Sequence, residues 1–254
     1  GAGTDSVSYS VSSGTWAGSI DEAETVSATY TGSATINATG ITGYTTLNIS
    51  ASDDTSSTTL NNIGSATINL SDDSVEGGGD GNIEAMTIDT TDDATITVDL
   101  GANQEATTAA AADLASLAIT DAATVTLKAS GGGFGNLLTH DFETVTLDDE
   151  ETTSLTITSG DYTSLEANIA GSESVATLDV QAEGAESDFT IDAFADPAAM
   201  TSLTLNADGL NSTITLGGNG TTVGAIGDAE NSVTAILDTV SVTASNGATI
   251  DANG

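Results

Sequence analysis

TVTLDDEETTSLTITSGDYTSLEANIAGSESVAT, residues 144–177, is the stretch that decides the fold. Its apolar residues Val145, Leu155, Leu165 and Val175 are spaced ten positions apart and are flanked by threonine, serine, alanine and, after Leu165, glutamate. Alternation of apolar and hydroxyl residues is typical of a strand with one buried face. Acidic or glycine-containing turns separate the runs. The stretch therefore predicts strands and turns at a constant pitch.

A pitch this short favours coils stacked on one another, because a single unit of this size cannot bury its own apolar face. Similar runs recur from about Ser33 almost to the end of the chain. Parallel strands in an ordinary βαβ sheet need crossovers of about a dozen residues or more, whereas a solenoid steps up one level per turn. We therefore predict an all-β, right-handed parallel β-solenoid of about a dozen coils with about 20 residues each. Neighbouring coils should be stacked at the usual distance between hydrogen-bonded strands.

Tandem immunoglobulin-like β-sandwiches are the alternative, since their strands also recur every 8–12 residues or so. Against them, the sequence lacks recognisable linkers and the large apolar anchors of such modules.

The solenoid is predicted to occupy residues 33–254. Residues 1–32 are outside the regular rhythm and are predicted to cap the solenoid or to exchange a strand with a neighbouring subunit. An alanine-rich stretch at residues 103–116 predicts a short helical insertion.

Charge limits the possible partners. The formal net charge is −37, and Lys128 is the only lysine or arginine among 254 residues. Nucleic acids and anionic membranes are recognised by basic patches, which this chain cannot form. The 38% hydrophobic content in ordered alternation argues against disorder. There is no cysteine, and no apolar run approaches the roughly 20 residues of a membrane-spanning helix.

Acidic turns predict calcium binding. Calcium takes six to eight or so oxygen ligands, and stacked turns would bring carboxylates of neighbouring coils into a row. With so few basic side chains, a metal ion is the natural counter-charge. A solvated acidic surface that binds nothing specifically is the alternative. The candidate ligands are Asp53, Asp54, Asp72, Asp73, Asp80, Asn82, Asp89, Asp92, Asp93, Asp148, Asp149, Glu150 and Asp161.

Composition and rhythm over about residues 33–250 resemble the calcium-dependent bacterial surface-layer proteins and RTX-type secreted proteins. The shared features are strands such as Thr-Val-Thr-Leu, abundant Ser, Thr, Asp and Gly, few basic residues and no cysteine. The resemblance implies a parallel solenoid with calcium at its turns that assembles laterally into sheets. Residues 78–83 (GGDGNI) match the glycines of the RTX repeat but place Ile83 where that repeat has aspartate, so surface-layer proteins are the better comparison.

An enzyme is not expected. A Ser/His/Asp triad would depend on His140, the only histidine, and the sequence contains no nucleophile-elbow motif. We expect an extracellular, cell-surface structural protein: a calcium-stabilised, secreted, self-assembling protomer of a surface layer or filament, forming a homo-oligomer. The alternative is a calcium-dependent adhesin or glycan-binding module.

Overall fold

The computed structural model describes most of the chain's strands and some of its turns. The described residues are 6–11, 14–16, 20, 23–30, 34–37, 44–51, 56–72, 83–100, 113–130, 138–147, 151–160, 163–170, 174–182, 188–194, 201–207, 212–216, 239–244 and 249–252.

These residues form eighteen strands and, within these ranges, no helix. The strands are β1 (Ser6–Val11), β2 (Gly14–Trp16), β3 (Thr25–Tyr30), β4 (Ala34–Asn37), β5 (Thr46–Ala51), β6 (Ser56–Ile63), β7 (Ala66–Asp72), β8 (Ile83–Leu100), β9 (Asp113–Ala129), β10 (Leu138–Thr146), β11 (Ser154–Ser159), β12 (Thr163–Ala170), β13 (Thr177–Ala182), β14 (Asp188–Phe194), β15 (Ser202–Ala207), β16 (Thr213–Leu216), β17 (Thr239–Ala244) and β18 (Thr249–Ala252).

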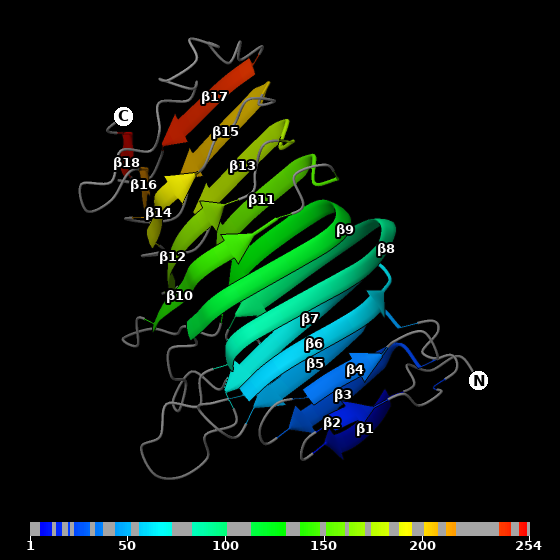
Figure 1. Ribbon diagram of the computed structural model, residues 1–254. Helices are drawn as coiled ribbons and strands as arrows, with labels where there is room; N and C mark the ends of the chain where they lie inside the picture. The colour runs from blue at the N-terminus through cyan, green and yellow to red at the C-terminus, as the bar shows by residue number, and fades with distance from the viewer. Residues whose placement is uncertain are drawn as a thin grey trace.

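Every strand pairs in parallel with the equivalent strand of the next coil, which makes the protein a parallel β-solenoid (Figure 1). We call the two columns of strands stack A and stack B. Stack A contains β1, β3, β5, β7, the C-terminal halves of β8 and β9, β11, β13, β15 and β17. Stack B contains β2, β4, β6, the N-terminal halves of β8 and β9, β10, β12, β14, β16 and β18.

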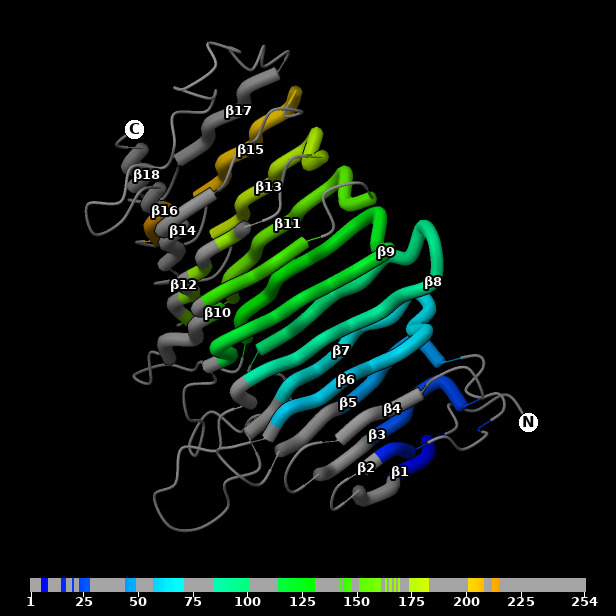
Figure 2. Tube along the Cα trace, in the orientation of Figure 1, coloured from blue at the N-terminus to red at the C-terminus, as the bar shows by residue number. Residues whose placement is uncertain are grey.

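The coils follow one another in sequence order from the N-terminal to the C-terminal end of the solenoid (Figure 2). Immunoglobulin-like sandwiches are antiparallel, so the alternative fold is wrong. The parallel solenoid predicted from the sequence is confirmed.

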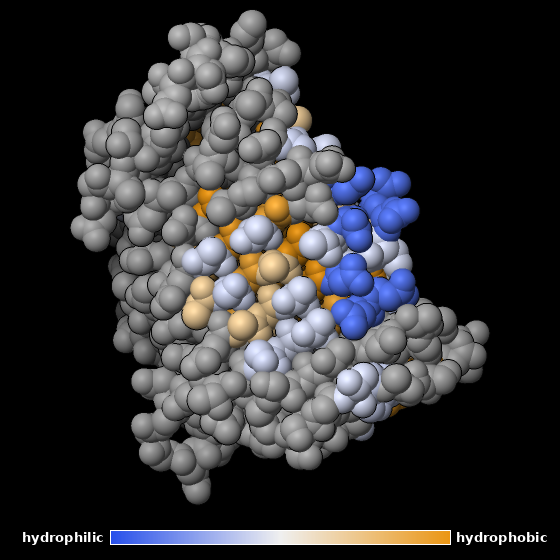
Figure 3. Space-filling view, in the orientation of Figure 1, coloured by the Kyte–Doolittle hydropathy of each residue, from blue (hydrophilic) through white to orange (hydrophobic). Residues whose placement is uncertain are grey.

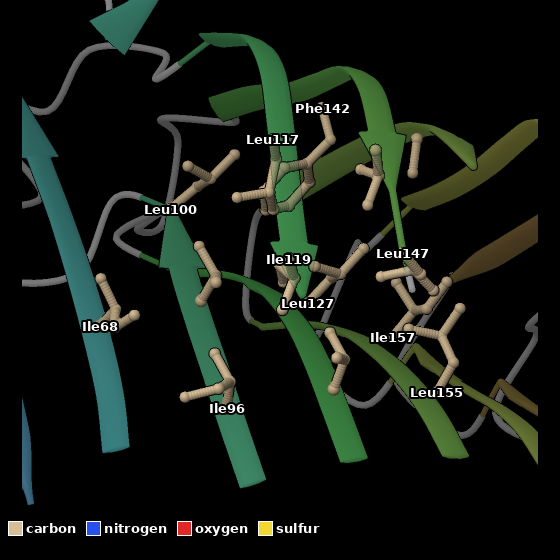
Figure 4. Packing of buried hydrophobic residues seen from close by; sticks show 14 of the residues in the cluster. Ile68, Ile96, Leu100, Leu117, Ile119, Leu127, Phe142, Leu147, Leu155 and Ile157 are labelled. Atoms are coloured by element: carbon tan, nitrogen blue, oxygen red, sulfur yellow. The ribbon is translucent and has the colours of Figure 1, made fainter. Parts of the chain in front are cut away.

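The core lies between the two stacks. One inward column of stack A runs through nine levels in unbroken register: Val7, Val26, Leu47, Ile68, Val98, Leu127, Ile157, Val180 and Leu205. In Figure 4, Leu117 and Ile119 of stack B and Leu127 and Ile157 of stack A extend into the same interior. Burying each such side chain contributes about 1.5–3 kcal/mol. The buried apolar residues of both stacks form a single cluster.

Coil length varies along the chain. The residues joined across one level are 21 positions apart at Asn48 and Asn69, 30 at Ala122 and Thr152, and 25 at Gln181 and Asn206. The prediction of about a dozen coils therefore exceeds the ten levels that the described strands of stack A form. The reason is that many coils are longer than about 20 residues.

Two local segments, the predicted helix at residues 103–116 and the N-terminal residues 1–32, can be compared with the structure where they are described. The C-terminal end of the predicted helix is wrong: residues 113–116 begin β9, where Leu114 pairs with Ile83 and is completely buried. The strand edge of the preceding coil offers hydrogen bonds along the segment, and this tertiary pairing outweighs helix propensity. Residues 101–112 lie outside the described residues. The N-terminal segment carries β1 to β3, which continue the register of both stacks.

Tyr44 connects two coils at the corner between β6 and β7. Its hydroxyl oxygen accepts a hydrogen bond from the backbone N–H of Gly64 at 2.9 Å. Burial raises the pKa of Tyr44 above its usual value, and the hydrogen bond from Gly64 opposes this rise only in part. The phenol is therefore held neutral at this contact between the coils.

Thr58 provides a test of the core. Its side chain is 2% exposed, and its hydroxyl has no hydrogen-bond partner within the described part of the chain. It points inward between the levels of Ala34 and Met86. A buried hydroxyl without a partner costs about 1–3 kcal/mol, so Thr58→Val, which exchanges the hydroxyl for a methyl group, should stabilise the protein by at least about 1 kcal/mol.

Urea unfolding measures this effect, with Thr59→Val as the control. Thr59 is half-buried on the outer side of the same strand, so its substitution should change the free energy of unfolding by less than about 0.5 kcal/mol. Loss of stability in Thr58→Val would mean that the hydroxyl is hydrogen-bonded in solution.

Candidate functional site

The bends of β8 and β9 form an acidic corner on the described surface. β8 and β9 each run through stack B, bend, and continue into stack A. Asp92 and Asp93 are exposed at the bend of β8, and Asp121 is half-buried at the bend of β9. Ala94 pairs with Ala122, so the two bends lie at neighbouring levels. Hydrophilic side chains gather at this edge in Figure 3.

The backbone explains why Asn and Asp occur at these bends. Asn62, Asp93 and Asp121 have positive φ angles of 58°, 61° and 63°. This left-handed conformation is unfavourable for most L-residues, but Asn and Asp tolerate it because their short polar side chains bond locally. The chain turns in the same way at three successive corners, with two carboxylates among the three side chains.

A substitution series at Asp93 tests this geometry. Asp93→Gly should be as stable as the parent or more stable, whereas Asp93→Ala should be less stable than the glycine variant by about 1 kcal/mol. Thermal unfolding of both variants provides the measurement. The control is Asp92, which is exposed and does not have a positive φ. There the order should reverse, and the same order at both positions would contradict the assigned corner conformation.

Hydroxyl groups beneath the corner tie successive coils together. The Thr90 hydroxyl donates to the carbonyl of Thr120 at 2.9 Å, and the Thr152 hydroxyl donates to the carbonyl of Ala122 at 2.9 Å. At the next level, the Ser174 hydroxyl donates to the carbonyl of Thr152 at 3.0 Å. Thr90 and Thr152 are buried, so these bonds fix the backbone from inside. The carboxylates outside are thereby held on a rigid frame.

Three of the thirteen predicted metal ligands have described side chains: Asp89, Asp92 and Asp93. All three belong to β8, and Asp89 is half-buried and accepts a hydrogen bond from Thr120 Oγ1 at 3.4 Å. Within the described ranges, no three acidic, histidine or cysteine side chains are grouped so that they could hold a metal ion. The calcium site is therefore still a prediction.

Ten predicted ligands cannot be placed by their side chains. Asp72 is described only as the last residue of β7. The others lie outside the described residues: Asp53, Asp54, Asp73, Asp80, Asn82, Asp148, Asp149, Glu150 and Asp161.

An ion pair on stack A is a feature that the sequence reasoning missed. Lys128 Nζ lies 3.1 Å from Asp99 Oδ2, and the side chains are 42% and 7% exposed, respectively. The Ser130 hydroxyl donates to Asp99 Oδ1. Asp99 and Lys128 are paired at adjacent levels of stack A. Aligning residues 95–100 with residues 124–129 places these two residues at the same position, which is the signal that could have revealed the pair.

Amide side chains form ladders on the outer side of stack A. Asn69 Nδ2 donates to Asn48 Oδ1 at 2.8 Å, and Asn48 Nδ2 donates to Ser27 Oγ at 3.1 Å. Farther along the rod, Asn206 Nδ2 donates to Gln181 Oε1 at 2.9 Å. These bonds run parallel to the solenoid axis and satisfy the outward amides within the chain.

Comparisons with protein-family models, curated proteins and solved structures gave no match. Across the described ranges, no helix has the length and apolar character needed to cross a membrane.

Proposed function

We propose that this protein is a calcium-stabilised structural protomer that assembles into an extracellular layer or filament. The observation that supports the proposal most directly is the stacking of acidic corners, in which the bends at Asp93 and Asp121 lie one level apart on a rigid frame. The corners at Asn62, Asp93 and Asp121 follow one another at successive levels of the described solenoid.

Stacked corners require a counter-charge. Adjacent levels of a parallel stack are about 4.8 Å apart, and like charges at such distances destabilise the structure. The chain has a single lysine, and Lys128 is already paired with Asp99. Cations from solution are the remaining source of positive charge, and carboxylate and carbonyl oxygens are ligands that calcium prefers.

The first and last described strands offer one possible route to assembly. Among the described strands, β1 and β2 have ladder partners only on the side of β3 and β4, and β17 and β18 only on the side of β15 and β16. Unpaired strand edges associate with other chains unless they are covered.

The test is the assembly state of the full chain with and without calcium. We expect ordered sheets or filaments by negative-stain electron microscopy in millimolar calcium, and dispersal of these assemblies by chelator. Light scattering should report the same change as a large, reversible increase in mass. A chain that stays monomeric in both conditions would contradict the proposal; if that monomer bound a glycan saturably in calcium, the adhesin function would replace it.

A further inference from the structure

The outer side of stack A is nearly free of charge. One outward column passes through nine levels as Ser6, Thr25, Thr46, Thr67, Thr97, Thr126, Thr156, Asp179 and Thr204, and the backbone ladder continues to Ser241 at a tenth level. The strand segments of stack A contain three of the 38 acidic residues, Asp72, Asp99 and Asp179, and Asp99 is neutralised by Lys128. We call the outward residues of these segments the neutral face.

Stack B differs in charge. Its strand segments carry Glu84, Asp89, Asp113, Asp141, Glu143, Glu166, Asp188, Asp192 and Asp251. The described strands of stack B therefore contain nine acidic residues, against three in those of stack A.

The neutral face is also the more regular side. Within the strand segments of stack A, residues pair level by level without a register shift, apart from the bend at Ala94 and Thr95. Stack B has irregularities between β6 and β8, β10 and β12, and β12 and β14. A regular ladder of short side chains presents an even surface for close packing.

We propose that the neutral face is the surface on which a second copy of this chain packs, a refinement that rests on the self-assembly proposed above. Two chains of net charge −37 repel each other through acidic surfaces, and neither offers a basic patch to the other. Depletion of charged residues is the compositional mark of the centre of a protein interface. The neutral face is the broad surface where two copies can approach with few opposing carboxylates.

The area of the neutral face suits this role. Ten levels about 4.8 Å apart, with strands of about six residues that rise about 3.3 Å each, cover about 43 by 20 Å. The result, about 850 Å², matches the roughly 800 Å² per partner buried in a standard protein interface. The face is thus large enough for stable pairing.

Two matched double variants of the full chain test the proposal. Thr67→Glu with Thr126→Glu places two charges on the neutral face, separated by the level of Thr97. The control, Thr59→Glu with Ala118→Glu, places two charges on stack B, separated by the level of Thr87. All four substituted side chains are half-buried and lie at outward positions. Sedimentation velocity in calcium should show at least tenfold weaker association for the first variant and unchanged association for the control.

The outcomes separate this inference from the proposed function. If the parent chain assembles and both double variants assemble equally, or both fail, the neutral face is not the interface, while the assembling function stands. If the parent is monomeric throughout, both proposals fall. Binding of a glycan by a monomeric parent, with loss only in the first variant, would assign the face to a sugar and overturn the self-packing proposal.

A cross-linking experiment covers the case in which the charged variant fails to fold. The chain has no cysteine, so Thr126→Cys and the control Ala118→Cys each introduce a single thiol. A bifunctional maleimide should join copies of the Thr126→Cys chain at least tenfold faster than copies of the Ala118→Cys chain. Equal rates would overturn the proposal.

Discussion

Replacing Leu127 with aspartate should unfold the protein. Leu127 is completely buried and lies between Val98 and Ile157 in the inward column of stack A. A carboxylate at this position loses its hydration, and the only described lysine points outward from the neighbouring residue to pair with Asp99. The cost should exceed about 4 kcal/mol, a large part of the 5–15 kcal/mol or so that stabilises a typical domain.

Circular dichroism and urea unfolding measure the result, with Thr126→Asp as the matched control. Thr126 is the preceding residue and points outward, where its ladder neighbours are Thr97 and Thr156. This position is a better control than Thr156, which pairs with Asp179 at the next level, because like charges directly opposite each other destabilise a sheet. Equal losses at positions 126 and 127 would show that the inward and outward faces are wrongly assigned.

Removal of calcium should produce the second large effect. A ligand that binds only the folded chain stabilises it by about 4 kcal/mol at a thousand times its Kd. For a chain of this size, this free energy corresponds to a change in melting temperature of roughly 10 °C. Thermal unfolding with millimolar calcium and with chelator should show this difference.

Ionic strength is the necessary control for the calcium experiment. Potassium chloride at matched ionic strength screens the acidic corners but does not coordinate them, so it should protect much less than calcium. Equal protection by the two salts would mean that the carboxylates form a solvated acidic surface and that calcium has no specific site.

The sequence determined which side of each strand is buried. Val145, Leu155, Leu165 and Val175, which define the ten-residue rhythm, are all completely buried. The alternation that reveals them is a local property, because successive side chains of a strand point to opposite faces whatever it pairs with. The sequence also identified Asp92 and Asp93 as part of an acidic turn.

Only the tertiary structure decided which levels are paired. In the repeating stretch, Leu155 is paired with Leu178, whereas Val175 is buried before β13 begins at Thr177. Turn lengths differ from coil to coil, so the level at which a strand lies depends on hydrogen bonds with the preceding coil.

The same long-range pairing determined the features that the sequence alone did not reveal. Residues 113–116 form a strand because they meet the edge of β8, and Asp121 joins the acidic corner because its bend stacks beside that of Asp93. The ion pair of Asp99 with Lys128 likewise joins residues of successive coils. Local alternation determines whether a side chain points inward or outward. Which residues lie beside it on the adjacent coils is determined by contacts between coils, and these form only when the levels stack.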